Sequence, residues 1–353
     1  MLVIVLGLAP AVAGGVSPED ERSVSSTRDR GTIRRIAYDA ADAHFRFFPI
    51  TNYVNTAFDT AQVSLAFDQD GYWRNHERVF DIIAHPHDNI VDDGGYDELL
   101  QQEFASSRVL PNITLHLLGN GYDYRILAEW FDHHRVPYPY VAAFLTSYAG
   151  YIGNEAIEAS NNEIDSLDHI ADLYIFNLAG NLMFTSDTVT DFVHNRLQMR
   201  NWTGQPVFDL RREEMRNASN NYILRPRLWD NGMRPFVYFG LHYFGGLSFA
   251  LADASEVSVG AGLAAKDPLR EGDSFADEFQ KIRASGGVFW DKGDRLLGSV
   301  IFNGTNDYLV RTNLYPEIFR NNWLGIGFFL AVSDGMVPSF GMTIQKILAL
   351  GFS

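Results

Sequence analysis

The chain has 353 residues and a formal net charge of −16. A surface this acidic repels phosphate backbones, so we expect no nucleic-acid partner. The chain contains no cysteine, which excludes structural disulfides, thiolate metal sites, cysteine nucleophiles and lipid attachment through an N-terminal cysteine.

The first 15 residues, MLVIVLGLAPAVAGG, form an apolar run that ends in small residues. This pattern predicts a signal peptide in residues 1–15, and the run is too short for a membrane-spanning helix. The alternative is a buried N-terminal strand. Residues 16–75 are predicted to form a flexible N-terminus followed by a short strand region, because AQVSLAF at 61–67 alternates apolar and polar residues.

Residues 76–198 have a helical period, which predicts a helical domain. Proline residues at 111, 137 and 139 interrupt the helices. Gly150 and Gly153 would allow a second helix to approach closely. The predicted helices lie near 96–107, 112–133, 138–160, 166–184 and 187–198.

A polar stretch at 199–220 is predicted to be a linker, and after residue 221 the period changes to two. The fold class is therefore α+β, with an N-terminal helical domain followed by an antiparallel β-barrel of about eight strands at 221–353. A soluble β domain has the same alternation and is the alternative. Lys346 on the apolar face disagrees with lipid exposure. The predicted strands lie near 221–229, 235–251, 255–264, 281–290, 295–303, 307–314, 322–333 and 339–352. The side chains predicted on the outside include Phe239, Leu241, Ile326, Phe328 and Leu350.

One group of candidate site residues lies in the helical half. Paired carboxylates with a histidine could bind a divalent metal or act in acid–base catalysis, and no other cofactor is indicated. The alternative is a structural polar network, since buried polar groups are usually paired. The candidates are Glu155, Glu158, Asp168, His169, Asp172 and Asn177.

Two weaker candidates lie elsewhere. His85 and His87 flank Pro86 and could share a metal, although no third ligand follows at fixed spacing and a proline turn is the simpler interpretation. His242 and Ser248 share the small face of a predicted strand, as a hydrolase pair would, but no third member of a triad is evident.

The His-Pro turn, the E-x-x-E pair and the pattern S-x-D-x-x-x-D-x-x-x-x-N-x-x-G resemble an uncharacterised group of bacterial envelope proteins, in which a helical region precedes a C-terminal outer-membrane barrel. The resemblance covers roughly residues 80–185 in motif and the rest only in layout. It implies an outer-membrane location and brings no known activity. The matching residues are His85, Pro86, Glu155, Glu158, Ser166, Asp168, Asp172, Asn177 and Gly180.

We therefore expect an outer-membrane-associated envelope protein with its helical domain in the periplasm. Its partners would be outer-membrane lipid and a further envelope protein, and its role would be structural, in assembly or in partner binding. The first alternative is an envelope enzyme that acts on lipid or cell wall through the carboxylate and histidine residues. The second is a soluble periplasmic binding protein.

Overall fold

The fold is taken from a computed structural model. The predicted signal peptide, the predicted strand at 61–67 and Lys346 lie outside the residues that the structure describes. These are residues 33–40, 47–59, 69–106, 108–159, 166–211, 214–229, 231–265, 282–302, 308–320, 324–333, 336–344 and 347–352.

The first half is helical, and the predicted helices are confirmed with small changes at their ends. Two further helices, α3 and the start of α4, lie in the region predicted to be flexible or extended. The π-helical segments are labelled η. The elements are α3 (Pro49–Ala57), α4 (Gln69–Ala84), α5 (Pro86–Asp92), α6 (Tyr96–Ala105), α7 (Val109–Pro111), η3 (Asn112–Asn120), α8 (Gly121–His133), α9 (Pro139–Glu158), α10 (Ser166–Ile170), η4 (Ala171–Phe176), α11 (Asn177–Phe184), α12 (Asp187–Asp191) and η5 (Phe192–Arg196).

Local chemistry explains several of these boundaries. Pro49, Pro86 and Pro139 each occupy the first position of a helix, where the missing N–H costs nothing. The predicted close approach at Gly150 and Gly153 is confirmed: added side chains there would meet α3 at 3.2 and 3.0 Å. The α3 helix therefore packs directly on α9.

The second half is a sheet in which most of the strands follow in chain order. They are β1 (Arg200–Asn201), β2 (Val207–Asp209), β3 (Glu214–Arg216), β4 (Tyr222–Leu224), β5 (Met233–Phe239), β6 (His242–Ala250), β7 (Ser255–Ala265), β8 (Ile282–Lys292), β9 (Arg295–Phe302), β10 (Val310–Arg320), β11 (Gly325–Val332), β12 (Pro338–Ile344) and β13 (Ile347–Phe352).

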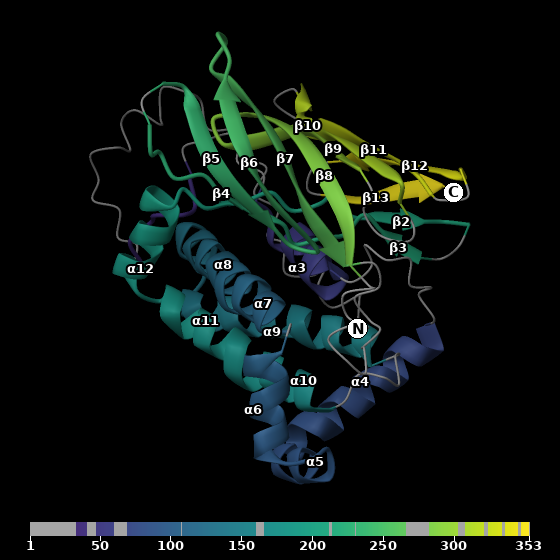
Figure 1. The fold of residues 1–353 in the computed structure, drawn as a ribbon. Helices are drawn as coiled ribbons and strands as arrows, with labels where there is room; N and C mark the ends of the chain where they lie inside the picture. Colours follow the sequence, from purple (N-terminus) through teal and green to yellow (C-terminus); the bar gives the residue numbers. More distant parts are fainter. Residues whose placement is uncertain are drawn as a thin grey trace. The chain divides into compact units, whose positions relative to one another are not determined.

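The helices-then-antiparallel-sheet architecture is confirmed, but the predicted closed barrel of eight strands is wrong. The structure has a large curled sheet in which each strand from β4 to β13 pairs antiparallel with the next (Figure 1). Two predicted strands are each hairpins. The 235–251 segment divides into β5 and β6, and 339–352 divides into β12 and β13. The eight predicted strands thus become ten.

The stretch predicted to be a linker, 199–220, carries β1, β2 and β3. These strands pair within one hairpin: β1 with β4, and β2 with β3. Trp202 N donates to Asn221 O at 2.7 Å and Gly204 N to Ser219 O at 2.8 Å, which continues the pairing between them. Because β2 also pairs parallel with β13, this hairpin lies at both ends of the sheet: its β1 strand is beside β4 at one end, and its β2 strand is beside β13 at the other.

The curl of the sheet is measured by rings that meet across its inner face. Tyr238 on β5 and Phe289 on β8 have centroids 4.7 Å apart. These strands are separated by β6 and β7, and three strand spacings in a flat sheet would be about 14 Å. The inner face is therefore concave and filled by an aromatic cluster, which also includes Trp202, Phe236 and Phe244.

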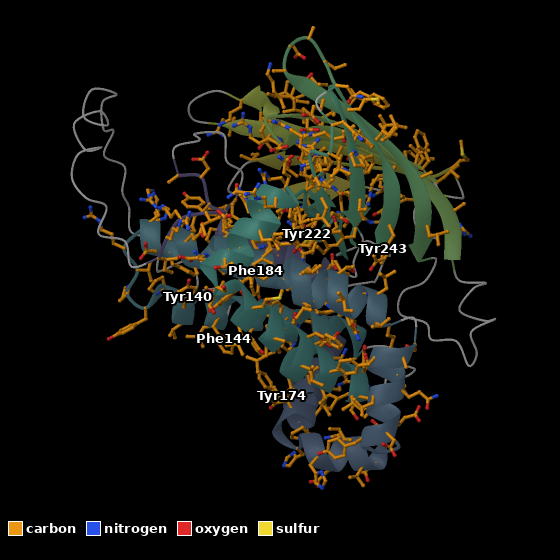
Figure 2. The ribbon with its side chains drawn as sticks, turned by 60° about the vertical axis from the view of Figure 1, so that its left-hand side comes forward. Tyr140, Phe144, Tyr174, Phe184, Tyr222 and Tyr243 are labelled. Atoms are coloured by element: carbon orange, nitrogen blue, oxygen red, sulfur yellow. The ribbon has the colours of Figure 1, made fainter. Side chains whose placement is uncertain are left out.

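The helices pack against the sheet at the β4–β6 end. Tyr222 and Phe239 on the sheet share a buried cluster with Tyr122 and Phe184 of the helices. Figure 2 shows Tyr222 and Tyr243 where the two halves meet, and the Tyr243 hydroxyl lies 3.0 Å from Thr114 Oγ1.

Candidate functional site

The predicted site residues of the helical half gather in one buried region, which we call the acidic cluster. It draws side chains from α6, α9, α10, η3 and η4, segments that are separated by up to about 70 residues in the chain. Its carboxylates are Glu103, Glu155, Glu158, Asp168 and Asp172, and its cationic or titratable partners are Arg108, His116 and His169.

Two π-helical segments position part of the cluster. The η3 segment carries His116 and Asn120, and η4 carries Asp172. π-Helical turns are rare and are frequent at functional sites. Here they bring His116 Nε2 to 3.1 Å from Asp172 Oδ2. Burial lowers the pKa of His116 to about 4. Burial also raises the pKa of Asp172 well above its ordinary value, and the negative charge of Asp168 raises it further. Both pKa directions favour neutral side chains.

Glu155 and His169 form the most deeply buried pair of the acidic cluster. Glu155 Oε2 lies 2.7 Å from His169 Nδ1, and both side chains are at most 1% exposed. Burial, followed by the nearby Asp168 and Glu103, raises the Glu155 pKa well above its ordinary value. The α9 helix places Glu155 here because its apolar residues pack this face inward.

The remaining predicted carboxylates lie at the margins. Asp168 Oδ1 accepts a hydrogen bond from Arg108 Nη1 at 3.1 Å, and the same nitrogen donates to Glu103 at 2.6 Å. Glu158 is partly exposed and accepts from Asn154 Nδ2 at 2.7 Å. Burial and neighbouring carboxylates raise the Glu158 pKa. The site predicted from the sequence does not include Glu103, Arg108 or His116, which no spacing motif marks.

Asn177 lies beside the cluster and accepts a hydrogen bond from Asn120 Nδ2 at 2.7 Å. This contact depends on a close crossing of α11 with η3 and α8. A side chain at Gly180 would meet the Leu117 carbonyl oxygen at 2.5 Å, and one at Gly121 would meet Phe184 at 2.6 Å. Glycine at both positions allows the crossing.

A cavity of about 20 Å³ lies against the cluster and is lined by Glu155, Asn154, Asn177, His116 and Asn220, among others. This volume admits a single water molecule or ion. A lipid or glycan substrate does not fit beside Glu155, so the geometry suits a small bound species better than acid–base chemistry on a large substrate.

The two histidines of the His-Pro turn do not form a site together. His85 Nδ1 lies 3.3 Å from Asp81 Oδ1, whereas His87 Nδ1 lies 3.1 Å from the Tyr96 hydroxyl. Both contacts are on the surface, and Pro86 starts α5 between them. In the part of the chain that the structure describes, no three His, Cys, Asp or Glu side chains form a group that could hold a metal.

The pair on the sheet is also separated by its contacts. Ser248 Oγ lies 2.6 Å from Ser258 Oγ, and the His242 ring packs on Phe244 with centroids 5.6 Å apart. Burial lowers the pKa of His242 well below its ordinary value, and the positive charge of Arg311 lowers it further. The contacts of these residues with their neighbours indicate packing roles.

A larger cleft of about 580 Å³ lies where residues 35–40 and 47–54, α8 and the β1–β2 segment meet. Its volume suits a small-molecule ligand. Its polar side chains are already engaged, however. Arg200 bonds two carbonyl groups and Asp294, Asn201 bonds Asp123, and Gln205 bonds Thr343 and three neighbours. The cleft therefore offers few free polar groups to a ligand.

A scan against protein-family models finds no match to this chain, and searches of curated proteins and of solved structures find none either. Among the helices that the structure describes, none is long and apolar enough to cross a membrane.

Proposed function

We propose that this chain is an envelope protein whose sheet lies in the outer membrane, with its convex face against lipid acyl chains and its helical half on the periplasmic side. One observation carries the proposal: the sheet is apolar on its outward face and polar or charged on much of its inward face. Soluble proteins have the opposite distribution, whereas membrane barrels have this one.

The strand register identifies the outward face as three cross-strand rows of eight residues, on β5 to β12. Thr312 is the one polar side chain in these rows, and none is charged. The rows are Met233, Phe249, Val257, Trp290, Gly298, Leu314, Phe328 and Met342; Pro235, Leu247, Val259, Val288, Val300, Thr312, Leu330 and Phe340; and Val237, Gly245, Ala261, Gly286, Phe302, Val310, Val332 and Pro338.

The inward row between the first two has a different composition. It contains Ser248, Ser258, Phe289, Ser299, Asn313, Phe329 and Gly341. The inward face also holds ion pairs among Arg225, Arg234, Glu256 and Asp291. These groups are buried by the curl of the sheet beside the aromatic cluster, so the charged groups lie on the inward face and not in the outward rows.

The outward rows are exposed and somewhat shorter than the apolar band of a membrane barrel. Leu330 is 49% and Phe340 56% exposed. On β8 the outward apolar residues run from Trp290 to Ala284, about 20 Å along the strand. The apolar band of membrane barrels is about 25 Å tall. The exposed ion pair of Lys292 and Asp253 lies just beyond Trp290.

Lipid accounts for this face better than a protein partner does. The rows continue over eight strands of a curved surface, and a single partner would have to wrap around all of them. Monomeric soluble proteins rarely expose apolar patches larger than a few hundred Å². A bilayer covers such a surface from every direction.

The test compares two lysine substitutions at equally exposed residues. Leu330 lies in the middle row, whereas Val337, 47% exposed, lies in the turn before β12. The full chain is folded into phosphatidylcholine vesicles and separated by flotation. We expect the wild type and Val337→Lys to float, and Leu330→Lys to lose about 2–4 kcal/mol of stability in the vesicle and to float less.

If both positions faced water, the two lysine substitutions should have similar effects. Equal behaviour of the two variants would therefore contradict the proposal. A wild-type chain that stays monodisperse in buffer without detergent and does not float would also contradict it. That result would favour a soluble binding protein, and a detergent-free dimer would favour a second copy on the apolar face.

A further inference from the structure

The cavity beside the acidic cluster is lined by buried polar atoms that have no protein partner among the described residues. They belong to side chains from α9 and the segment before β4. Buried polar atoms are nearly always hydrogen-bonded, so several unsatisfied atoms around one cavity indicate a bound species. The atoms are Glu155 Oε1, Asn154 Oδ1 and Asn220 Oδ1.

All three atoms are oxygens whose orientation is set by their neighbours. Asn154 Nδ2 donates to Glu158 at 2.7 Å, which leaves its carbonyl oxygen toward the cavity side. Asn220 Nδ2 donates to Thr56 Oγ1 at 3.3 Å, with the same consequence. Glu155 contacts His169 through Oε2, which leaves its other carboxylate oxygen, Oε1, without a partner. The cavity thus has one unpartnered carboxylate oxygen and two unpartnered amide oxygens, and Asp59 also lines it.

The charge around the cavity is unbalanced. The acidic cluster contains five carboxylates against Arg108 and two histidines. Even with both histidines protonated, the carboxylates would outnumber the cations by two. Buried charge of one sign is costly unless it is paired, so a cation in the cavity would stabilise the ionised cluster.

We propose that this cavity binds one Ca²⁺ ion through Glu155, Asn154 and Asn220. Ca²⁺ takes carboxylate and amide oxygens in flexible geometry, whereas Mg²⁺ requires a tighter octahedral shell and keeps several waters. The volume of about 20 Å³ holds a single ion and excludes an organic ligand. No group of three acidic or histidine ligands is found among the described residues, and the proposed site depends on amide oxygens beside Glu155. The proposal goes beyond the membrane location and does not depend on it.

The test is calorimetric titration of Ca²⁺ into the full chain after EDTA treatment, together with melting temperature with and without Ca²⁺. We expect one ion per chain, with a Kd in the millimolar range or below, and a higher melting temperature in Ca²⁺. Glu155→Gln and Asn154→Leu should each weaken binding by about tenfold or more. Glu77→Gln, an exposed acidic residue on α4, is the control and should bind as the wild type does.

Glu155→Gln also separates loss of the site from loss of the fold. Glutamine has the shape of a protonated glutamate, so without Ca²⁺ this variant should melt close to the wild-type temperature while its response to Ca²⁺ disappears. The absence of binding heat and of a melting shift in the wild type would mean that the cavity holds water only, which overturns the inference. Unchanged binding by Glu155→Gln overturns it too. Neither result bears on vesicle flotation.

Discussion

Arg225 shows how single residues hold the inner face of the sheet. Its guanidinium is fully buried and donates to both oxygens of Asp291, at 2.7 and 2.8 Å, and to Asp294 at 2.6 Å. It also lies 5.0 Å from the Trp202 ring. A bidentate pair of this kind is among the stronger charged contacts in proteins, and each partner depends on the other to offset its desolvation.

We expect Arg225→Met to lower the free energy of unfolding by about 3–5 kcal/mol, because it leaves Asp291 buried without its cation. Chemical denaturation measures this loss. The control is Arg34→Met, since Arg34 pairs with Asp191 at 3.9 Å with both side chains well exposed, and its loss should cost less than about 1 kcal/mol. Similar losses in both variants would argue against a role for burial.

At the scale of elements, the helical half depends on one close crossing. The backbones of α11 and η3 approach at Gly180, where an added methyl group would meet the Leu117 carbonyl oxygen at 2.5 Å. This oxygen belongs to the backbone and cannot rotate away as a side chain would. The crossing also sets the Asn120–Asn177 hydrogen bond.

Gly180→Ala should therefore lower the free energy of unfolding by about 1–3 kcal/mol, as overpacking does. The matched control is Gly245→Ala on β6, where nothing lies within 4 Å of the added carbon. This control should be neutral or slightly stabilising, because alanine restricts the unfolded chain. Melting curves compare the two, and an unchanged melting temperature for Gly180→Ala would show that the crossing can widen freely.

The strand pairing explains why the sequence predicted the face on which each side chain lies better than it predicted the number of strands. In both missed hairpins, residues of the same parity pair across the turn, as Val237 does with Gly245 and Met342 with Leu350. The apolar alternation therefore continues through the turn without a break. The outward placement of Ile326 and Phe328 was predictable from this alternation and is confirmed by their burial pattern. Phe239 is buried by the helices, which no local pattern reveals.

At the scale of the whole molecule, the candidate site was predictable only in part. Asp172 and Asn177 are conspicuous because they interrupt apolar helical sequence. Glu103, Arg108 and His116 are ordinary helix residues, and only the packing of α6 and η3 against α10 and η4 brings them to the same cluster. Contacts between distant segments depend on tertiary packing, which the local sequence does not contain.

Asp123 joins the two halves of the molecule through one carboxylate. It lies on α8 and accepts hydrogen bonds from Asn52 of α3, Asn201 of β1 and the Tyr222 hydroxyl of β4, at 2.8, 2.6 and 2.9 Å. Burial raises the Asp123 pKa to about 6, and the three donors oppose this rise. The packing of helices against sheet is therefore linked to the protonation of this group.

The raised pKa of Asp123 makes the stability of the fold depend on pH. The unfolded side chain ionises near pH 4 and the folded one near pH 6, so the folded state holds a proton that the unfolded state has lost. Stability should fall as pH rises through this window, by about 3 kcal/mol in total. Asp123→Asn removes this contribution, so the unfolding free energy of the variant minus that of the wild type should rise between pH 4 and pH 6 and then level off. Tyr222→Phe removes one donor to the ionised form and should move the upper end of the window to higher pH. A difference between Asp123→Asn and the wild type that is constant with pH would mean that Asp123 stays ionised in the fold.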